Sequence, residues 1–181
     1  MTTYTGLAWV DLDEETLKAI DNAASPEAKV NILTQAMEMR HYGDNPRSGV
    51  LVDFYFYNLM FCEENNFSYL KKSALFSIMK EVFVHGFEGP TPVPPEESLE
   101  FLKRSVLAHS VEAPTEGRAG VFTLPEVKLI VAFVGKTFYR NYSAYRLVFT
   151  TRRPVTKATR HLCVETPLMP APLDLADSAE D

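Results

Sequence analysis

Helix-start signals recur along this chain and constrain its fold more than any other feature. Most consist of a side chain that can accept a hydrogen bond from a free backbone N–H, followed by proline or an acid. They stand at Asp11 or Asp13, Ser25-Pro26-Glu27, Asn45-Pro46, Pro95-Glu96-Glu97 and Thr123-Leu124-Pro125-Glu126. Their recurrence predicts an all-α protein, a compact bundle of about five to six helices with a proline-rich connector and an extended tail.

The most apolar segment runs from Pro46 to about Asn65 and contains VLVDFYFYNLMFC. A strand has to be considered, because Val, Phe and Tyr favour sheets. The run is long, lacks turn residues and begins at a helix cap, so we expect a helix. Since its apolar residues cover nearly the whole circumference, this helix should be buried at the centre of the core. Asp53 is the one ionisable side chain that we expect at low solvent exposure.

The neighbouring helices are predicted from the same kind of signal. The helix that begins at Ser25 is expected to continue to about Arg40, with Gly43 ending it. Another begins at Phe67-Ser68 and ends by Gly86 to Gly89, before the connector GPTPVPPEE. We expect its polar residues to remain in solvent, namely Lys71, Lys72, Lys80 and Glu81.

The last helix begins at a capping box, with Thr123 at the cap and Glu126 three residues later. It continues, or kinks near Gly135, until Pro154 stops it. Residues 113–120 before it are expected to form a loop. We therefore expect one helical domain over residues 1–153. Residues 154–181, with many acids and prolines towards the end, should form an extended or disordered tail.

Charge and composition exclude several classes of partner. The net charge is −6 and the pI is about 5.3, so no overall field favours nucleic acid or an anionic membrane. No run of about 18 apolar residues exists, and the first residues do not resemble a secretory signal. Cys62 and Cys163 lie far apart and suit a reducing compartment, so we expect a cytoplasmic protein.

A search for catalytic, cofactor-binding or metal-binding residues yields none. The four histidines lie in four different segments, and no zinc pattern is present. The acidic run that begins at Asp11 has Thr16 and Asn22 where a calcium loop needs Gly and Glu. Gly135-Lys136-Thr137 lacks the earlier glycine of a phosphate-binding loop. Asp53 could be catalytic if buried, but no acid–base partner is apparent.

Basic and aromatic residues alternate from Lys136 to Arg153. One interpretation is an amphipathic core helix whose bases are solvated. A second is a protein contact surface, because Tyr and Arg are favoured in interfaces. A calmodulin-like or nucleic-acid contact is a third. The candidate interface residues are Lys136, Tyr139, Arg140, Tyr142, Tyr145, Arg146, Arg152 and Arg153.

Two stretches carry a family resemblance. The stretch from Asp53 to Val82, DFYFYNLMFCEENNFSYLKKSALFSIMKEV, has an aspartate before an aromatic-rich helix and a Phe-Ser helix start. The stretch from Phe122 to Phe149 has a Phe-x-Leu-Pro-Glu helix start that leads into a tyrosine-rich segment. Both resemble the CLAMP-domain proteins, which are small subunits of a projection on one central-pair microtubule of motile cilia. The similarity covers roughly residues 30 to 150.

This resemblance implies a non-enzymatic subunit of the central apparatus, located in the cytoplasm and the ciliary axoneme. Its implied partners are sibling CLAMP-domain subunits, a large scaffold protein and calmodulin, with only indirect association with the microtubule. The assembly would contribute to calcium-responsive control of beating. The family provides no catalytic residue and no cofactor.

Two other functions remain open at this point. Residues Lys136 to Arg153 could bind calmodulin directly and make the chain a soluble calcium-signalling adaptor. The chain could also be an enzyme or a small-molecule-binding domain built around Asp53. That function requires a concave pocket at the Asp53 carboxylate.

Overall fold

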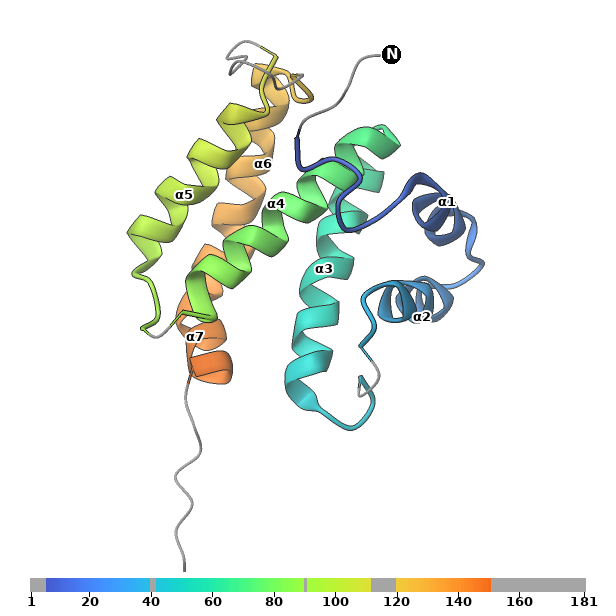
Figure 1. Cartoon of the computed structure of the whole chain (residues 1–181), viewed down its shortest axis with the longest axis horizontal. Helices are drawn as coiled ribbons and strands as arrows, with labels where there is room; N and C mark the ends of the chain where they lie inside the picture. The colour runs from blue at the N-terminus through green and yellow to red at the C-terminus, as the bar shows by residue number, and fades with distance from the viewer. Residues whose placement is uncertain (1–5, 40–41, 90, 112–119, 151–181) are drawn as a thin grey trace, which may run out of the picture. The chain divides into compact units, whose positions relative to one another are not determined.

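The computed structural model describes residues 6–39, 42–89, 91–111 and 120–150 (Figure 1). These residues form seven α-helices and one 3-10 turn, and their only extended pairing is an isolated parallel bridge between Ser110 and Phe122. The helices are α1 (Glu14–Asn22), α2 (Pro26–Ala36), α3 (Pro46–Glu64), α4 (Tyr69–Phe87), α5 (Pro95–Ala108), α6 (Leu124–Thr137), η1 (Tyr139–Asn141) and α7 (Tyr142–Thr150). The all-α prediction is confirmed.

The predicted caps are present at the helix starts. The side chains of Asp13, Ser25 and Asn45 accept backbone hydrogen bonds at the starts of α1, α2 and α3. At the start of α6, the backbone N–H of Thr123 donates to Glu126 Oε2 at 2.8 Å. These bonds pair backbone donors that a helix start leaves without a partner.

α2 ends earlier than predicted, at Ala36 rather than near Arg40. Its end is a Schellman motif, in which the N–H of Met39 donates to the carbonyl of Thr34 and the N–H of Glu38 to that of Gln35. Glu38 has a φ of 54° in this motif. A glutamate therefore occupies the left-handed position that usually holds glycine, and for this reason Gly43 does not end the helix.

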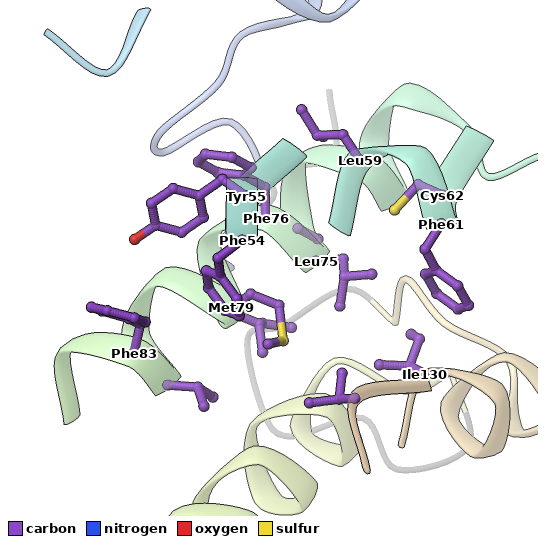
Figure 2. Close-up of a cluster of buried hydrophobic side chains, with 14 of the residues drawn as sticks. Phe54, Tyr55, Leu59, Phe61, Cys62, Leu75, Phe76, Met79, Phe83 and Ile130 are labelled. Atoms are coloured by element: carbon purple, nitrogen blue, oxygen red, sulfur yellow. The ribbon is translucent and has the colours of Figure 1, made fainter. Parts of the chain in front are cut away.

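The central helix is α4, not α3 as predicted. α4 packs against α1, α3, α5 and α7 and crosses the middle of the bundle (Figure 1). Its interior side chains meet those of α3 in the main core (Figure 2). The labelled members of this core are Phe54, Tyr55, Leu59, Phe61, Cys62, Leu75, Phe76, Met79, Phe83 and Ile130.

The position of α4 buries a lysine that we had expected in solvent. Lys72 is only 5% exposed, and its ammonium group forms an ion pair with Asp21 of α1. Lys71 pairs with Glu126 and Lys80 with Asp11. Glu81 is exposed as predicted, whereas Lys71 and Lys80 are half-buried, because helices pack against α4 on several sides.

A segment before α1 also lies against α4. The backbone N–H of Trp9 donates to Ser73 Oγ at 2.8 Å, and Ser73 Oγ donates to the carbonyl of Leu12 at 2.8 Å. His109 lies at the end of α5. Its Nε2 accepts a hydrogen bond from the N–H of Leu7, and its Nδ1 donates one to the carbonyl of Ser105. These bonds join the N-terminal segment to α4 and α5.

The last helical segment is interrupted near Gly135, as expected. α6 ends at Thr137, and the turn η1 leads into α7. The predicted loop at 113–120 has only Gly120 inside the described residues, and the predicted tail at 154–181 lies outside them.

Candidate protein interface

The alternating segment that begins at Lys136 separates into an inner and an outer face. Phe138 and Tyr142 are 2% and 3% exposed, and Tyr139 and Tyr145 are half-buried. The cations of this segment, by contrast, are exposed: Lys136, Arg140 and Arg146. Arg152 and Arg153 lie outside the described residues. The segment is therefore an amphipathic part of the core that presents its positive charge to solvent.

The inner face completes the aromatic core. The ring centroid of Phe138 lies 5.2 Å from that of Phe54, and Tyr145 lies 5.9 Å from the same ring. Tyr142 packs against Phe87 at 4.9 Å. Such tilted and edge-to-face contacts are the favoured arrangements of aromatic pairs. The tyrosines therefore hold η1 and α7 against α3 and α4.

Their hydroxyl groups find partners inside the protein. The hydroxyl of Tyr139 lies 3.0 Å from Ser98 Oγ of α5. The hydroxyl of Tyr142 donates to the carbonyl of Val93 in the proline-rich connector. Burial raises the pKa of both phenols, and burial together with the charge of Asp53 raises the pKa of Tyr145. The hydroxyls of Tyr139 and Tyr142 therefore remain neutral hydrogen-bonding anchors at physiological pH.

The outer face differs from the rest of the protein in its ion pairs. Every lysine of α1 to α5 pairs with a carboxylate: Lys18, Lys29, Lys71, Lys72, Lys80 and Lys103. Over the described residues, four cations of α6, η1 and α7 form no ion pair: Lys128, Lys136, Arg140 and Arg146. The sequence has no Asp or Glu from Val127 to Val164. Arg104 of α5 is also exposed and forms no ion pair within the described part of the chain, so unpaired charge is not confined to this face. What distinguishes the face is that Lys136, Arg140 and Arg146 follow one another in the sequence without a carboxylate between them.

A groove of about 660 Å³ opens between α3 and this face. One wall belongs to α3 and consists of Phe54, Tyr57, Asn58, Met60, Phe61 and Glu64. The other wall consists of Phe133, Lys136, Thr137, Phe138, Arg140, Asn141 and Tyr145. Phe61 and Phe133 join the walls by stacking at 4.0 Å. The groove therefore combines an aromatic floor with two exposed cations along one rim.

The α3 wall was not predicted as a surface, because the helix was expected to be buried all round. Tyr57 is 65% exposed, and Met60 and Glu64 line the groove beside it. A second depression, towards the link between α1 and α2, is lined by the same three residues. Positions 53, 57, 60 and 64 share one helix face. The acids at both ends of this stripe were the available sign that it faces solvent.

Asp53 is exposed, contrary to the prediction of a shielded carboxylate. It lies on the outer side of α3 and is absent from the groove lining. Its two neighbours in the sequence, Val52 and Phe54, both turn into the core, whereas Asp53 does not. The pocket that an enzyme built on Asp53 would need is therefore not centred on this carboxylate.

The remaining ionisable side chains do not assemble into a metal site within the described ranges, where no three His, Cys, Asp or Glu side chains come together. His85 stacks on Phe101 at 4.2 Å, and His109 is bonded to backbone groups. His41 and His161 fall outside the described residues. Burial raises the pKa of the Cys62 thiol to about 12, so this cysteine is a poor nucleophile.

Comparison with known protein families identifies the family to which the sequence belongs. A family model described as "Flagellar C1a complex subunit C1a-32", the CLAMP family, matches residues 57–156. The chain belongs to the CLAMP family. The match begins on the exposed side chain of Tyr57 and includes α4, α5, α6 and α7 with the whole groove wall opposite α3. The resemblance recognised in the sequence is thereby confirmed.

Membership in the CLAMP family implies a flagellar protein that functions within a complex and so has protein partners. The family is described by its place in that complex and not by a reaction. Among the described helices, none is both long and apolar enough to cross a membrane.

Proposed function

We propose that this chain is a non-catalytic structural and regulatory subunit of an axonemal central-apparatus projection. In that position it contributes to assembly of the projection and to calcium-linked control of ciliary beating. The observation that carries the proposal is the CLAMP family match over residues 57–156. A surface built for contact, with an aromatic groove and unpaired cations, supports it.

The proposed partners are sibling CLAMP-domain subunits and the large scaffold protein of the projection, with microtubule association through them. The exposed bases Lys136, Arg140 and Arg146 supply the direct contacts, together with Arg152 and Arg153 beyond the described residues. The tyrosines at 139, 142 and 145 support this surface from below. Residues 1–153 act as the domain, and residues 154–181 as an extended segment available to a neighbour.

Nucleic acid and membranes are not proposed partners. The chain carries a net charge of −6, so a nucleic-acid backbone or an anionic bilayer would meet overall repulsion. The flat, buried rings of the inner face also offer little surface on which bases could stack.

Calmodulin is proposed as a partner within the complex and not as a ligand that wraps around residues 136–153. A calmodulin target presents its apolar anchors on a free amphipathic helix. Here Phe138 and Tyr142 are core residues, and Phe149 packs on Phe83 at 4.8 Å. Direct binding would have to extract these side chains from the core. The adaptor alternative is therefore the weaker of the two functions.

The test is recovery from axonemes. The tagged full-length chain is expressed in a ciliated cell, and isolated axonemes are extracted with salt and separated by size. We expect the chain in one large complex that contains sibling subunits, scaffold and calmodulin. Recovery as a free small protein, or absence from axonemes, would overturn the proposal.

The regulatory part needs its own measurement. Cells that lack the chain are compared with cells that express it again, and beat frequency is recorded over a calcium series. We expect the calcium response to be reduced in the first and restored in the second. An unchanged response would leave the chain a purely structural subunit.

A further inference from the structure

The groove between α3 and the α6–η1–α7 wall has the shape and charge of a docking site for one kind of segment. We propose that it binds an acidic amphipathic helix supplied by another protein of the complex. The inference rests on the proposed function and adds the chemistry of the partner to it.

Charge is the first argument. Lys136 and Arg140 stand on one rim, exposed and without an ion pair in the described part of the chain, whereas every lysine of α1 to α5 is paired. Glu64 lines the opposite wall but forms no ion pair with either cation. A ligand that carries carboxylates along one side would supply the pairing that this chain lacks.

The floor of the groove requires apolar side chains from the same ligand. Phe61 and Phe133 form a stacked pair across it, and Phe54 and Phe138 lie beside them. On the α3 rim, Tyr57 and Met60 are of the types favoured at protein interfaces. Because the groove lies between two helical walls, it matches a third helix that packs into it.

The dimensions suit about three helical turns. The α3 wall extends from Phe54 to Glu64, which is ~15 Å at 1.5 Å per residue. A helix of that length presents apolar anchors at positions i, i+3 or i+4, and i+7. Its carboxylates would lie on the side that faces Lys136 and Arg140. A disordered polyacidic segment has the charge but lacks these anchors.

Single-stranded nucleic acid is an alternative ligand, because it also binds to surfaces that combine cations with aromatic rings. However, Phe54 and Phe138 are only 6% and 2% exposed, so their faces are already covered by protein. Among the other rings of the groove lining only Tyr57 is exposed, whereas Phe133 and Tyr145 are half-buried and Phe133 already stacks on Phe61. An acidic helix needs only the ring edges and is the occupant that the groove favours.

The test places a photo-crosslinker in the groove of the full-length chain. Tyr57 is replaced by p-benzoylphenylalanine, the purified chain is added to a salt extract of axonemes, and the mixture is irradiated. Gln35, exposed on α2 and absent from the groove lining, receives the same residue as a control. Cross-linked peptides are then identified by mass spectrometry.

We expect position 57, and not position 35, to cross-link to a segment of another protein that is rich in Asp or Glu. That segment should carry apolar residues at helical spacing. Cross-linking to residues 151–181 of the chain itself, to a second copy or to nucleic acid would overturn the proposal. So would an acidic segment without apolar periodicity.

A matched pair of charge reversals tests the rim. Lys136→Glu with Arg140→Glu should lower the yield of cross-link at position 57 by about tenfold. Arg104→Glu with Lys128→Glu changes the net charge equally at exposed positions outside the groove and should leave the yield unchanged. Equal losses from both pairs would show general electrostatic attraction and overturn a specific site.

Sedimentation of the same mixtures separates the two proposals. If the chain enters the large complex but position 57 cross-links no better than position 35, the groove proposal fails and the proposed function stands. If the chain does not enter the complex, the proposed function fails and the groove proposal fails with it.

Discussion

The hydroxyl of Tyr142 donates a hydrogen bond to the carbonyl oxygen of Val93 at 2.9 Å, across 49 residues of sequence. The N–H of the same Val93 donates to the carbonyl of Gly86 at 3.2 Å. One residue of the proline-rich connector is therefore held from both sides, by the end of α4 and by the start of α7. The connector is part of the fold because of these two bonds.

The first prediction concerns this junction. A Cβ added to Gly86 would lie 2.9 Å from the Tyr142 hydroxyl oxygen. Gly86→Ala should therefore destabilise the protein by about 1–3 kcal/mol, as overpacking of a closed site does. Tyr142→Phe, which removes only the bond to Val93, should cost about 1 kcal/mol. Urea denaturation followed by circular dichroism measures both.

The double variant makes the prediction specific. Tyr142→Phe removes the clashing oxygen, and the next ring atoms lie at 3.7 and 3.8 Å from the added Cβ, which are ordinary contacts. Adding Gly86→Ala to Tyr142→Phe should therefore cost less than adding it to the natural chain. Strictly additive effects would contradict the contact. Tyr57→Phe, at an exposed site, should change the stability little.

The second prediction contrasts two glycines. A Cβ on Gly120 would lie 2.3 Å from the Cα of Val111, which is backbone and cannot swing away. Gly120→Ala should break the pairing of Val111 with Phe122 and destabilise strongly, by about 3 kcal/mol or more. Gly135 lies inside α6 with nothing within 4 Å of its added Cβ, so Gly135→Ala should stabilise by about 0.5–1 kcal/mol. Thermal melting of the two variants should move in opposite directions.

Much of the fold could be predicted because helix starts depend on neighbouring residues. The bonds of Ser25 and Asn45 to backbone N–H groups two or three residues later follow from the sequence alone. Helix ends were harder to place, since α2 ends with Glu38 in a left-handed conformation that its side chain does not favour. Tertiary packing determines such positions, and no local pattern reports it.

In the candidate site, too, one part could be predicted from the sequence and another could not. The exposure of Lys136 and Arg140 follows from an amphipathic segment whose aromatic residues turn inwards. The α3 wall of the groove could not be predicted. A run of Val, Phe and Tyr does not indicate which sides of the helix other helices will cover. Asp53 and Tyr57 are exposed, since none of the described helices covers these two side chains. Sequence indicated half of the groove.

The third prediction concerns the buried ion pair. Lys72 Nζ lies 2.6 Å from Asp21 Oδ2, and their side chains are 6% and 26% exposed. Asp21→Asn would leave a buried ammonium group without its carboxylate and should cost about 2 kcal/mol. Lys72→Met removes the charge but keeps the apolar stem, so it should cost less, ~1 kcal/mol or below. Urea denaturation ranks the two variants.

A control comes from an exposed pair. Lys103 bonds Glu100 on the surface of α5 at 2.6 Å, and Lys103→Met should change the stability by less than ~0.5 kcal/mol. If Lys72→Met instead costs more than Asp21→Asn, the Lys72 ammonium group would stabilise the folded state even without the Asp21 carboxylate. Partners other than Asp21 would then have to be sought, starting with the ring of Tyr69 at 5.5 Å.

The fourth prediction concerns pH. Burial raises the pKa of the Cys62 thiol from its ordinary value of 9.0 to about 12. Between these values the unfolded chain loses the thiol proton and the folded chain keeps it. The free energy of unfolding should therefore fall as pH rises from 9 to 12, by up to about 1.4 kcal/mol per pH unit from this group. Cys62→Val should show a shallower fall, since it lacks the thiol.

Reactivity gives a second readout of the same burial. In a Cys163→Ser background, Cys62 is the only thiol, so its reaction with a disulfide reagent can be followed alone. At pH 8 the folded chain should hold about a thousandfold less thiolate than the unfolded chain and react correspondingly slowly. The rate should rise steeply with urea at the unfolding midpoint. Fast reaction without urea would mean that the helices around Cys62 open readily, and that α3 is held less firmly against α4 than its packing indicates.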